Sequence, residues 1–407
     1  MRKFKVAAAL TAAVLALSGC ATGSGAAPLI GSPKEITIWA GENEVAGLQE
    51  IARQYTEDTG VQVNLVQRNF NAQVVSDFIT QVPTGQGPDI VLGAHDFLGQ
   101  LVTNGILAPV ELGDRQDEFA DVATRAVTYQ GKTYGIPVSI ETIALLRNNA
   151  LTQESPQTFE ELITAGQKVV DTGTADYPLA IPQTPEGSDP YHLYPLQTSF
   201  GAPVFKTNAD GEYIPELAMG GAQGQEFAEY LAQLGKRGVL NTSLTTDVTK
   251  DLFIRGKTPF LVSGPWNLPD LRAANLDMTA LPIPPAGEQP AQPFVGVQMA
   301  YLNAESRAPL AAQDFATNYL TREDAQLAMY NANGRSPALQ SAIAKIDDET
   351  IKKYADIAAT GVPMPAIPQM AAVWSFWGAT EAGIINQSGD PRTLWDRMIT
   401  SIEGAIK

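Results

Sequence analysis

Side chains that act as nucleophiles or bind transition metals are scarce in this chain. The 407 residues include two histidines, His95 and His192, and a single cysteine, Cys20. Zinc sites and pairs of a nucleophile with a base need several such side chains close together. We therefore expect neither chemistry, and no metal or cofactor.

Two Gly-Lys-Thr triplets, which begin at Gly131 and Gly256, resemble the end of a phosphate-binding loop. That loop also requires a glycine five residues earlier, where its backbone curls around the phosphates. Ala126 and Asp251 occupy those positions. The triplets therefore predict no nucleotide site.

Carboxyl groups, in contrast, are abundant, with 44 Asp and Glu residues. Hydrolysis of a glycosidic bond needs only two carboxyl groups that flank the bond. Composition therefore leaves open a surface glycoside hydrolase that acts on oligosaccharides.

The elements that position such groups must form about two globular units, because 407 residues exceed the usual size of a single core. Hydrophobic residues make up 44% and charged residues 17% of the chain, which is typical of a folded protein. The formal net charge of −17 repels phosphate backbones, so we expect no nucleic-acid partner. A neutral or cationic ligand fits this charge better.

The amino terminus carries the signs of export. Three basic residues within positions 2–5 precede an apolar stretch, residues 6–17, that is shorter than the ~20 residues of a spanning helix. The following Leu-Ser-Gly-Cys, residues 17–20, is similar to the lipobox of bacterial lipoproteins, whose cysteine is lipidated. The alternative is an ordinary signal followed by an unpaired thiol, which exported proteins rarely keep.

We therefore expect residues 1–19 to be a signal peptide and Cys20 to carry the lipid. Residues 20–33 are rich in Gly, Ser, Ala and Pro, which predicts a flexible tether. Two or more acyl chains hold a protein stably on a bilayer. The expected location is the outer face of the cytoplasmic membrane.

Strands and helices alternate after the tether. The runs 36–39 and 90–92 are apolar or β-branched, apolar residues alternate with polar ones over residues 61–65, and apolar residues at helical spacing extend from Val45 to Tyr55. This pattern predicts an α/β fold with a parallel sheet, whose ligand crevice lies beyond the carboxyl ends of the strands. Residues directly after the strands are therefore candidates for a site.

Helix starts are also visible further along. Thr158 and Glu161 form a capping box ahead of a helix that we expect to reach Val170. Ser336-Pro337 has the arrangement of a cap and a first-turn proline, which predicts another helix directly after it. The proline-rich run 282–293 predicts a connection between two units.

Five segments, in this order, resemble the maltose-binding protein family of extracellular solute-binding proteins, the substrate-binding lipoproteins of sugar ABC transporters. They are TGQGPDIVLGAHD (84–96), YQGKTYGIPVSIETIAL (129–145), FIRGKTPFLVSGPW (253–266), PFVGV (293–297) and PMPAIPQMAAVWSFW (363–377). The resemblance covers nearly the whole chain after the signal.

The resemblance implies a two-lobed periplasmic-binding-protein fold of the type II-like class, with a hinge of several crossing segments and a ligand cleft between the lobes. One lobe would comprise residues 32–138 and 296–345, and the other residues 139–295 and 346–407. It also implies a monomer without catalytic activity. This monomer would bind maltose, a malto-oligosaccharide or a related saccharide and deliver it to the transmembrane permease subunits of an ABC importer.

Polar positions of the family can be carried over one at a time. Asp96 and Glu141 match acidic residues that accept hydrogen bonds from sugar hydroxyls. Asp189 matches an acidic contact in the other lobe. Glu42 and Asn43 stand near the place of an Asp-Lys pair, so the resemblance implies a role in ligand binding for them too.

Apolar positions can be carried over in the same way. Ala94 matches a wall position beside Asp96, and Tyr191 matches an aromatic contact. Trp266 and Trp374 match aromatic residues that stack on sugar rings.

The chain also departs from the family pattern. Gly93 stands where the family has Trp, Phe97 and Gly378 where it has Arg, and Ser375 where it has Tyr. Phe376 and Trp377 are candidates for restoring aromatic surface. These departures leave the identity, linkage and length of the saccharide open.

The implied residue types suit a sugar. A pyranose has an apolar face of C–H bonds and a rim of hydroxyls, so its site needs flat aromatic side chains and fixed hydrogen-bond acceptors. Besides the receptor and the hydrolase, a sugar-sensing subunit that reports to a signalling protein remains an alternative. Of the histidines, we expect His95 to be structural and leave His192 open.

Overall fold

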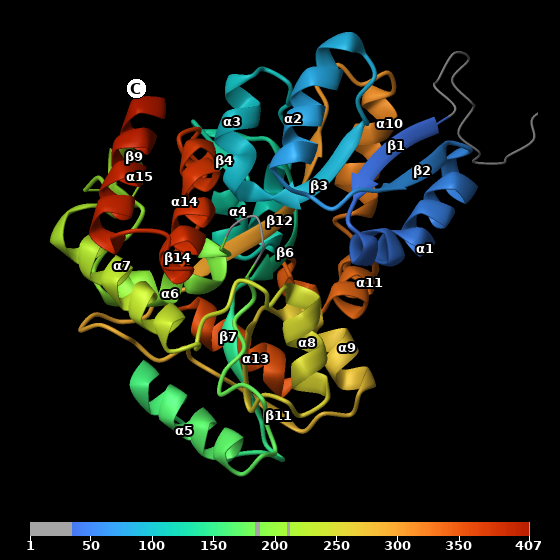
Figure 1. Ribbon diagram of the computed structural model, residues 1–407. Helices are drawn as coiled ribbons and strands as arrows, with labels where there is room; N and C mark the ends of the chain where they lie inside the picture. Colours follow the sequence, from blue (N-terminus) through green and yellow to red (C-terminus); the bar gives the residue numbers. More distant parts are fainter. Residues whose placement is uncertain (1–34, 184–187, 210–211, 407) are drawn as a thin grey trace, which may run out of the picture. The chain divides into compact units, whose positions relative to one another are not determined.

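The computed structural model describes residues 35–183, 188–209 and 212–406. Within these ranges strands and helices form a mixed α/β fold, which confirms the predicted class (Figure 1). The predicted signal peptide, Cys20 and the tether lie outside the described residues. No helix in the described part of the chain combines the length and the apolar character needed to cross a bilayer.

The largest sheet has the strand order β13-β6-β12-β3-β1-β2, and β14 pairs with β12. Its strands are β1 (Glu35–Ala40), β2 (Gln62–Gln67), β3 (Ile90–Ala94), β6 (Gly135–Glu141), β12 (Phe294–Leu302), β13 (Ser336–Pro337) and β14 (Val362–Pro363). β1 is parallel to β2 and β3, whereas β12 is antiparallel to β3 and β6. The expectation of a purely parallel sheet was wrong, because β12 does not arrive through a helical crossover.

A second sheet of three strands has the order β10-β7-β11 and is antiparallel. It consists of β7 (Ala144–Asn148), β10 (Phe260–Ser263) and β11 (Met278–Leu281). The chain leaves the large sheet after β6, forms β7, and returns from β11 to β12. The predicted connection at residues 282–293 therefore links the two sheets.

Two short hairpins complete the strands of the described residues. They pair β4 (Thr128–Tyr129) with β5 (Lys132–Thr133) and β8 (Phe205–Thr207) with β9 (Tyr213–Leu217).

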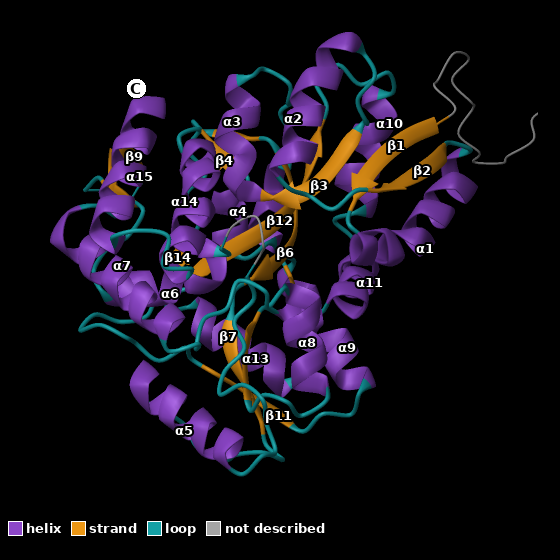
Figure 2. Ribbon diagram, in the orientation of Figure 1, coloured by secondary structure: helices purple, strands orange, loops and turns teal. Residues whose placement is uncertain are grey.

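Helices cover both sheets, as Figure 2 shows. The α-helices are α1 (Glu42–Thr59), α2 (Ala72–Gln81), α3 (Leu98–Thr103), α4 (Asp121–Ala126), α5 (Phe159–Asp171), α6 (Pro190–Ser199), α7 (Gly221–Lys236), α8 (Thr246–Ile254), α9 (Leu268–Ala273), α10 (Pro309–Asp314), α11 (Glu323–Asn333), α12 (Gln340–Ile343), α13 (Glu349–Ala358), α14 (Met370–Ile385) and α15 (Pro391–Ala405). Short 3₁₀ turns include η2 (His95–Phe97) and η4 (Pro265–Asn267).

Local signals correctly predicted several of these elements. α1 ends at Gly60, which adopts the left-handed conformation that glycine tolerates. The side chain of Thr158 accepts a hydrogen bond from the backbone of Glu161 and caps α5.

The helix predicted directly after Ser336-Pro337 was wrong. These two residues form β13, in which Ser336 pairs with Ile140 of β6. The next helix, α12, begins only at Gln340. Pairing with a strand far away in sequence therefore overrides the local cap signal.

The buried hydrophobic residues that the structure describes form four clusters. We group these clusters into two cores of two clusters each, core A and core B. Core A packs on the two faces of the large sheet: Ile36 and Ile38 lie with α1, whereas Trp39 lies with α2. The buried members of core A come from residues 36–138 and 297–342. Those of core B come from residues 143–294 and 351–402.

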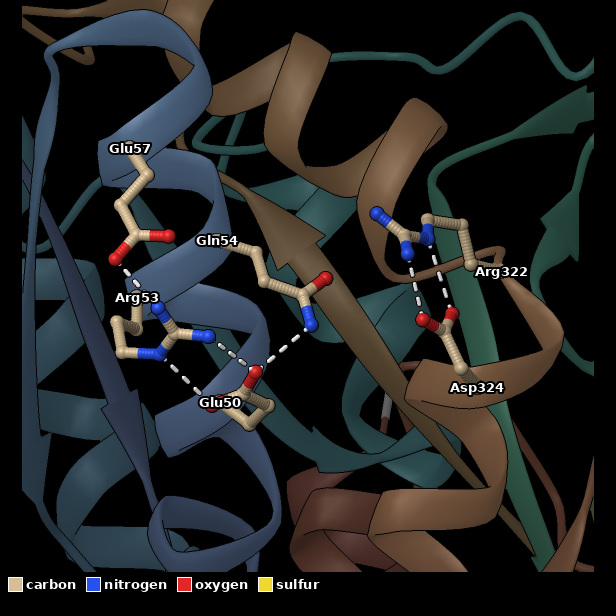
Figure 3. A network of polar contacts seen from close by, with 6 residues as sticks. All are labelled: Glu50, Arg53, Gln54, Glu57, Arg322 and Asp324. Carbon is tan, nitrogen blue, oxygen red and sulfur yellow. Dashed lines mark hydrogen bonds and ion pairs between the residues drawn. The ribbon is translucent and has the colours of Figure 1, made fainter.

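The outer face of α1 carries exposed ion pairs rather than packing contacts. Arg53 lies between Glu50 and Glu57, and Gln54 also donates to Glu50 (Figure 3). Exposed ion pairs one helical turn apart contribute little to stability, because solvent screens them. The burial of Leu48 and Ile51 in core A, and not this network, therefore holds α1 on the sheet.

Candidate functional site

One edge of the large sheet gathers acidic residues. β1 is parallel to β3, and β3 and β6 are both antiparallel to β12, so the carboxyl ends of β1, β3 and β6 share this edge. Glu44 lies in the first turn of α1 after β1, Asp96 follows β3, and Glu141 ends β6. Ligand sites of α/β sheets lie at such an edge.

A cavity of about 350 Å³ opens between these ends and segments of core B. It is lined by Phe70, Ala94, Asp96, Phe97, Glu141, Asp189, Tyr191, Trp266, Arg335, Met364 and Trp374. This volume lies within the range of small-molecule sites.

The cavity brings together most of the site residues expected from the sequence. Those that line it are Ala94, Asp96, Glu141, Asp189, Tyr191, Trp266 and Trp374. Two others, Glu42 and Asn43, are exposed on the first turn of α1 and do not line it.

Trp377 lies one layer behind the cavity wall. Its side chain is fully buried in core B, and its ring stacks on that of Trp374 with centroids 5.4 Å apart. Trp377 therefore supports Trp374 from behind. Of the departures from the family pattern, Phe97 lines the cavity, whereas Ser375 and Gly378 do not.

Asp96 is a buried carboxyl group with one oxygen available. Its side chain is 6% exposed, and Oδ2 accepts a hydrogen bond of 2.9 Å from the indole nitrogen of Trp374. Oδ1 is buried and has no partner among the described residues. Burial, reinforced by the nearby charge of Glu141, raises the pKa of Asp96 to about 7, although the Trp374 bond lowers it in part. A ligand hydroxyl that donates to Oδ1 would offset the free energy lost by burying this carboxylate without a second hydrogen bond.

His95 fixes the position of Asp96 rather than facing the cavity. Its Nδ1 accepts from the backbone N–H of Val297 at 3.1 Å, which leaves Nε2 to donate to the carbonyl of Met364 at 3.1 Å. Burial lowers the pKa of His95 to about 4, so the ring is neutral at physiological pH. The expected structural role of His95 is confirmed.

Glu141 already has partners on both oxygens. Oε1 accepts from the side-chain amide of Gln298 at 2.9 Å, and Oε2 accepts from Nε of Arg335. A side chain at Gly296 would crowd this carboxylate, since a Cβ there would lie 3.1 Å from Cγ of Glu141. Glu141 is thus a fixed acceptor with little freedom to move.

The start of α6 supplies another set of polar groups. Nδ1 of His192 lies 2.7 Å from Oδ2 of Asp189, so these residues form a pair beside the cavity. Tyr191, between them, turns its ring toward Trp266 and Phe294, at centroid distances of 6.2 and 6.1 Å. The hydroxyl of Tyr191 and Nε2 of His192 are buried and have no partner among the described residues.

Aromatic side chains provide the flat surfaces of the cavity. Trp266 follows β10 in η4, and its ring lies so close to Gly264 that a methyl group there would be 1.9 Å from it. Trp374 contributes a second indole, and Phe97 packs edge-on against Phe70 with centroids 5.6 Å apart.

Phe70 explains why residue 93 is glycine. A Cβ at Gly93 would lie 2.3 Å from the Phe70 ring. The phenyl group thus fills the space above β3 that a side chain at position 93 would need. The resemblance implies a tryptophan at position 93. In this chain Phe70 supplies the aromatic ring at that place.

Sequence reasoning missed four contributors: Phe70, Met364 and Arg335, which line the cavity, and Glu44, which holds Arg335. Arg335 lies in the turn directly before β13. Because a helix was expected to start at Ser336-Pro337, nothing in the sequence indicated that Arg335 lies beside the large sheet. In the sequence, the glycine at position 93 was the only sign that another side chain fills the space there.

The arrangement is suited to binding. Within the described ranges, no group of three or more His, Cys, Asp and Glu side chains is arranged to hold a metal ion. The cavity combines aromatic faces with polar atoms that have no hydrogen-bond partner among the residues that the structure describes.

Comparisons with known proteins agree with this view. The family described as "Bacterial extracellular solute-binding protein" matches residues 50–359. The maltodextrin-binding protein of Bacillus subtilis is 27% identical over 380 residues, which cover 90% of this chain and 89% of that protein.

Two further relatives are similar over at least as much of the chain. The galactooligosaccharide-binding protein of Bacillus subtilis is 24% identical over 386 residues, 92% of this chain and 90% of its own. The maltooligosaccharide ABC transporter solute-binding lipoprotein of Streptococcus pneumoniae strain R6 is 25% identical over 423 residues, 100% of this chain and 98% of its own.

Proposed function

The chain belongs to the family of bacterial extracellular solute-binding proteins, and from this premise we propose that it is the sugar receptor of an ABC importer. It binds maltose, a malto-oligosaccharide or a related saccharide in the cavity and delivers it to the transmembrane permease subunits. It has no catalytic activity of its own.

One observation carries the proposal: the cavity pairs aromatic faces with unsatisfied polar atoms. Oδ1 of Asp96 and the hydroxyl of Tyr191 are buried without partners in the described part of the chain, beside the rings of Trp266 and Trp374. A buried polar group without a hydrogen bond costs about 1–3 kcal/mol, which a sugar hydroxyl would recover. The aromatic rings match the C–H face of a pyranose.

The relatives narrow the ligand class to oligosaccharides. Their names specify maltodextrin, galactooligosaccharide and maltooligosaccharide. We place malto-oligosaccharides first, because two of these three names and the sequence segments point to them. A galacto-oligosaccharide is the next candidate.

We further propose that lobe closure accompanies binding. The lobes comprise residues 32–138 with 296–345 and residues 139–295 with 346–407. Cores A and B support this division, since all their buried members fall within the corresponding lobe. The cavity wall takes residues from both, for example Asp96 from one and Trp266 from the other.

The receptor acts as a monomer outside the cytoplasmic membrane. Removal of residues 1–19 leaves Cys20 at the amino terminus, where its lipid anchors the protein to the outer face of the membrane. The tether at residues 20–33 keeps the receptor near its permease. The basic and apolar stretch and the lipobox-like segment support this part of the proposal.

Calorimetric titration tests the function. The purified chain is titrated with maltose, maltotriose, longer maltodextrins, galacto-oligosaccharides and, as unrelated sugars, xylo-oligosaccharides. We expect a Kd in the micromolar range or tighter for one of the first four, which corresponds to about −8 kcal/mol. Absence of binding across the panel would overturn the proposal.

The same samples distinguish the receptor from the hydrolase. After several hours, a receptor leaves the oligosaccharide intact, whereas a glycoside hydrolase releases new reducing ends. An increase in reducing sugar that scales with protein concentration would replace the transport role by a catalytic one.

A further inference from the structure

Arg335 occupies a position that the surrounding backbone fixes closely. It follows Gly334, which ends α11 in the left-handed conformation with φ 72°. A side chain at position 334 would collide with the carbonyl oxygen of Pro265, since a Cβ would lie 2.4 Å from it. The side chain of Asn333 accepts a hydrogen bond of 2.9 Å from the backbone N–H of Arg335. The β13 pairing then places Arg335 beside the end of β6.

The guanidinium group of Arg335 joins three distant parts of the chain. Nη1 donates to Glu44 of α1 at 2.8 Å, and Nε donates to Glu141. The guanidinium carbon lies 5.4 Å from the centroid of the Trp266 ring, within the range of a cation–π contact. The side chain is only 14% exposed, so these contacts are shielded from salt and water.

Arg335 nevertheless keeps hydrogen-bonding capacity. A guanidinium group has five N–H donors, and two of the three nitrogens account for the two ion pairs. Nη2 donates to none of the residues that the structure describes, and Arg335 lines the cavity next to Trp266. Free donors therefore stand at the edge of an aromatic face, where the hydroxyl rim of a stacked sugar would lie.

The charges around Arg335 restrict which sugars fit. Among the residues that line the cavity, Arg335 is the only Arg or Lys, whereas Asp96, Glu141 and Asp189 are acidic. Glu44 adds a fourth carboxylate behind the wall. Because two of these carboxylates already engage Arg335, a ligand carboxylate would meet an excess of negative charge.

On these grounds, we propose that Arg335 is a ligand-binding residue that donates to sugar hydroxyls beside Trp266, and that the carboxylates around it confine the site to saccharides without carboxylates. The inference rests on the proposed sugar-binding function and deepens it. The planar fork of arginine holds Glu44, Glu141 and the indole face at once, which a lysine cannot do. Arg335 thus holds the aromatic face in position, and the two carboxylates that neutralise Arg335 leave it no free charge to attract an acidic ligand.

Two titration series on the full chain test this inference. The first measures the binding of maltotriose, of a neutral galactotriose and of trigalacturonate to the unaltered protein. We expect the tighter of the two neutral sugars to bind at least tenfold more strongly than trigalacturonate. Equal or stronger binding of trigalacturonate would overturn the charge restriction while leaving saccharide binding intact. If none of the three binds, the longer maltodextrins of the calorimetric panel decide: absence of binding there as well would overturn the sugar-binding function, and this inference with it.

The second series compares Arg335→Lys with a matched control, Arg272→Lys. Arg272 is also a partly buried arginine paired with a carboxylate, Asp348, but it does not line the cavity. We expect Arg335→Lys to weaken binding of the preferred neutral sugar at least tenfold and Arg272→Lys to change it less than twofold. Thermal unfolding of each variant checks that it is folded.

A purely structural role for Arg335 makes a different prediction. Folded Arg335→Lys would then bind the neutral sugar within twofold of the unaltered protein, and this result would overturn the inference. If Arg335→Lys does not fold, the comparison of neutral and acidic sugars on the unaltered chain decides alone.

Discussion

The indole nitrogen of Trp374 donates a hydrogen bond of 2.9 Å to Oδ2 of Asp96, although 278 positions separate the two residues. The bond ties a helix of core B to the turn that follows β3 of core A. It orients Asp96 so that Oδ1 is left without a protein partner in the described part of the chain.

Asp96→Asn should stabilise the ligand-free protein at pH 8. Burial raises the pKa of Asp96 from 3.8 to about 7, so the folded state binds a proton more tightly than the unfolded state between these values. The resulting stability is complete below pH 3.8 and is lost as the pH rises to 7. Asparagine does not ionise, so the free energy of unfolding at pH 8 should increase by up to about 4 kcal/mol.

Urea unfolding at pH 8 and pH 5 measures this effect. The gain should shrink at pH 5, and Asp247→Asn, at an exposed position, should show no gain at either pH. A lower stability of Asp96→Asn at pH 8 would mean that the Trp374 bond outweighs the cost of burying the charge.

Sugar affinity should itself depend on pH. Hydroxyl donors favour the ionised form of Asp96, whose pKa in the free protein is about 7. The association constant should therefore fall by up to about tenfold between pH 8 and pH 6. Titration calorimetry at several pH values checks this, and the slope should disappear in Asp96→Asn. A flat profile for the unaltered protein would show that Asp96 does not accept from the ligand.

Trp266→Ala should weaken sugar binding at least tenfold without unfolding the protein. The substitution removes an aromatic face of the cavity and the partner of the Arg335 cation–π contact. Phe376→Ala serves as a control, because Phe376 is exposed and does not line the cavity. Calorimetry gives the affinities, and equal values for both variants would remove Trp266 from the site.

The packing of Phe70 on Gly93 can be tested by a double-mutant cycle. Gly93→Ala should lower the free energy of unfolding by roughly 1–3 kcal/mol, because the new methyl group collides with the Phe70 ring. In a Phe70→Ala background the same change should cost much less. Equal costs in both backgrounds would mean that the strain at position 93 arises elsewhere.

Cys20→Ala should release the protein from the membrane. In the proposed lipoprotein the acyl chains would be on Cys20, because the chain has no other cysteine. Metabolic labelling with a radioactive fatty acid should mark the unaltered chain and leave Cys20→Ala unlabelled. Labelling that survives the substitution would place the lipid on another residue.

The sequence was informative wherever a pattern is local. The strands near residues 36–39 and 90–92 follow from short apolar and β-branched runs, and the helix that ends at Gly60 follows from its periodicity and its terminating glycine. Asp96 could be expected at a site because it directly follows one of these strands.

Pairing between distant segments, however, determines structure that local patterns do not predict. Ser336-Pro337 resembles a helix start, yet its partner strand ends at Glu141, nearly two hundred positions earlier, and this pairing carries Arg335 into the cavity. No local signal encodes that contact.

The first turn of α1 shows a second limit. Successive residues of a helix are rotated by about 100°, so an offset of one or two positions turns a side chain away from its target. Glu42 and Asn43 were expected near the ligand, but Glu44 is the residue that reaches Arg335. A resemblance between sequences that is inexact by one or two positions therefore predicts the helix turn but not the residue on it that reaches the cavity wall.

The interleaving of the two cores has a consequence for how the chain is made. Core A needs residues 297–342 as well as residues 36–138, so the first third of the chain emerges from the ribosome without the partners that complete its interior. Contacts between such distant segments form slowly, because a long loop must close before they contribute. A newly synthesised chain therefore cannot complete core A until residues 297–342 have been made, so export through a narrow translocation channel would precede the closure of this core.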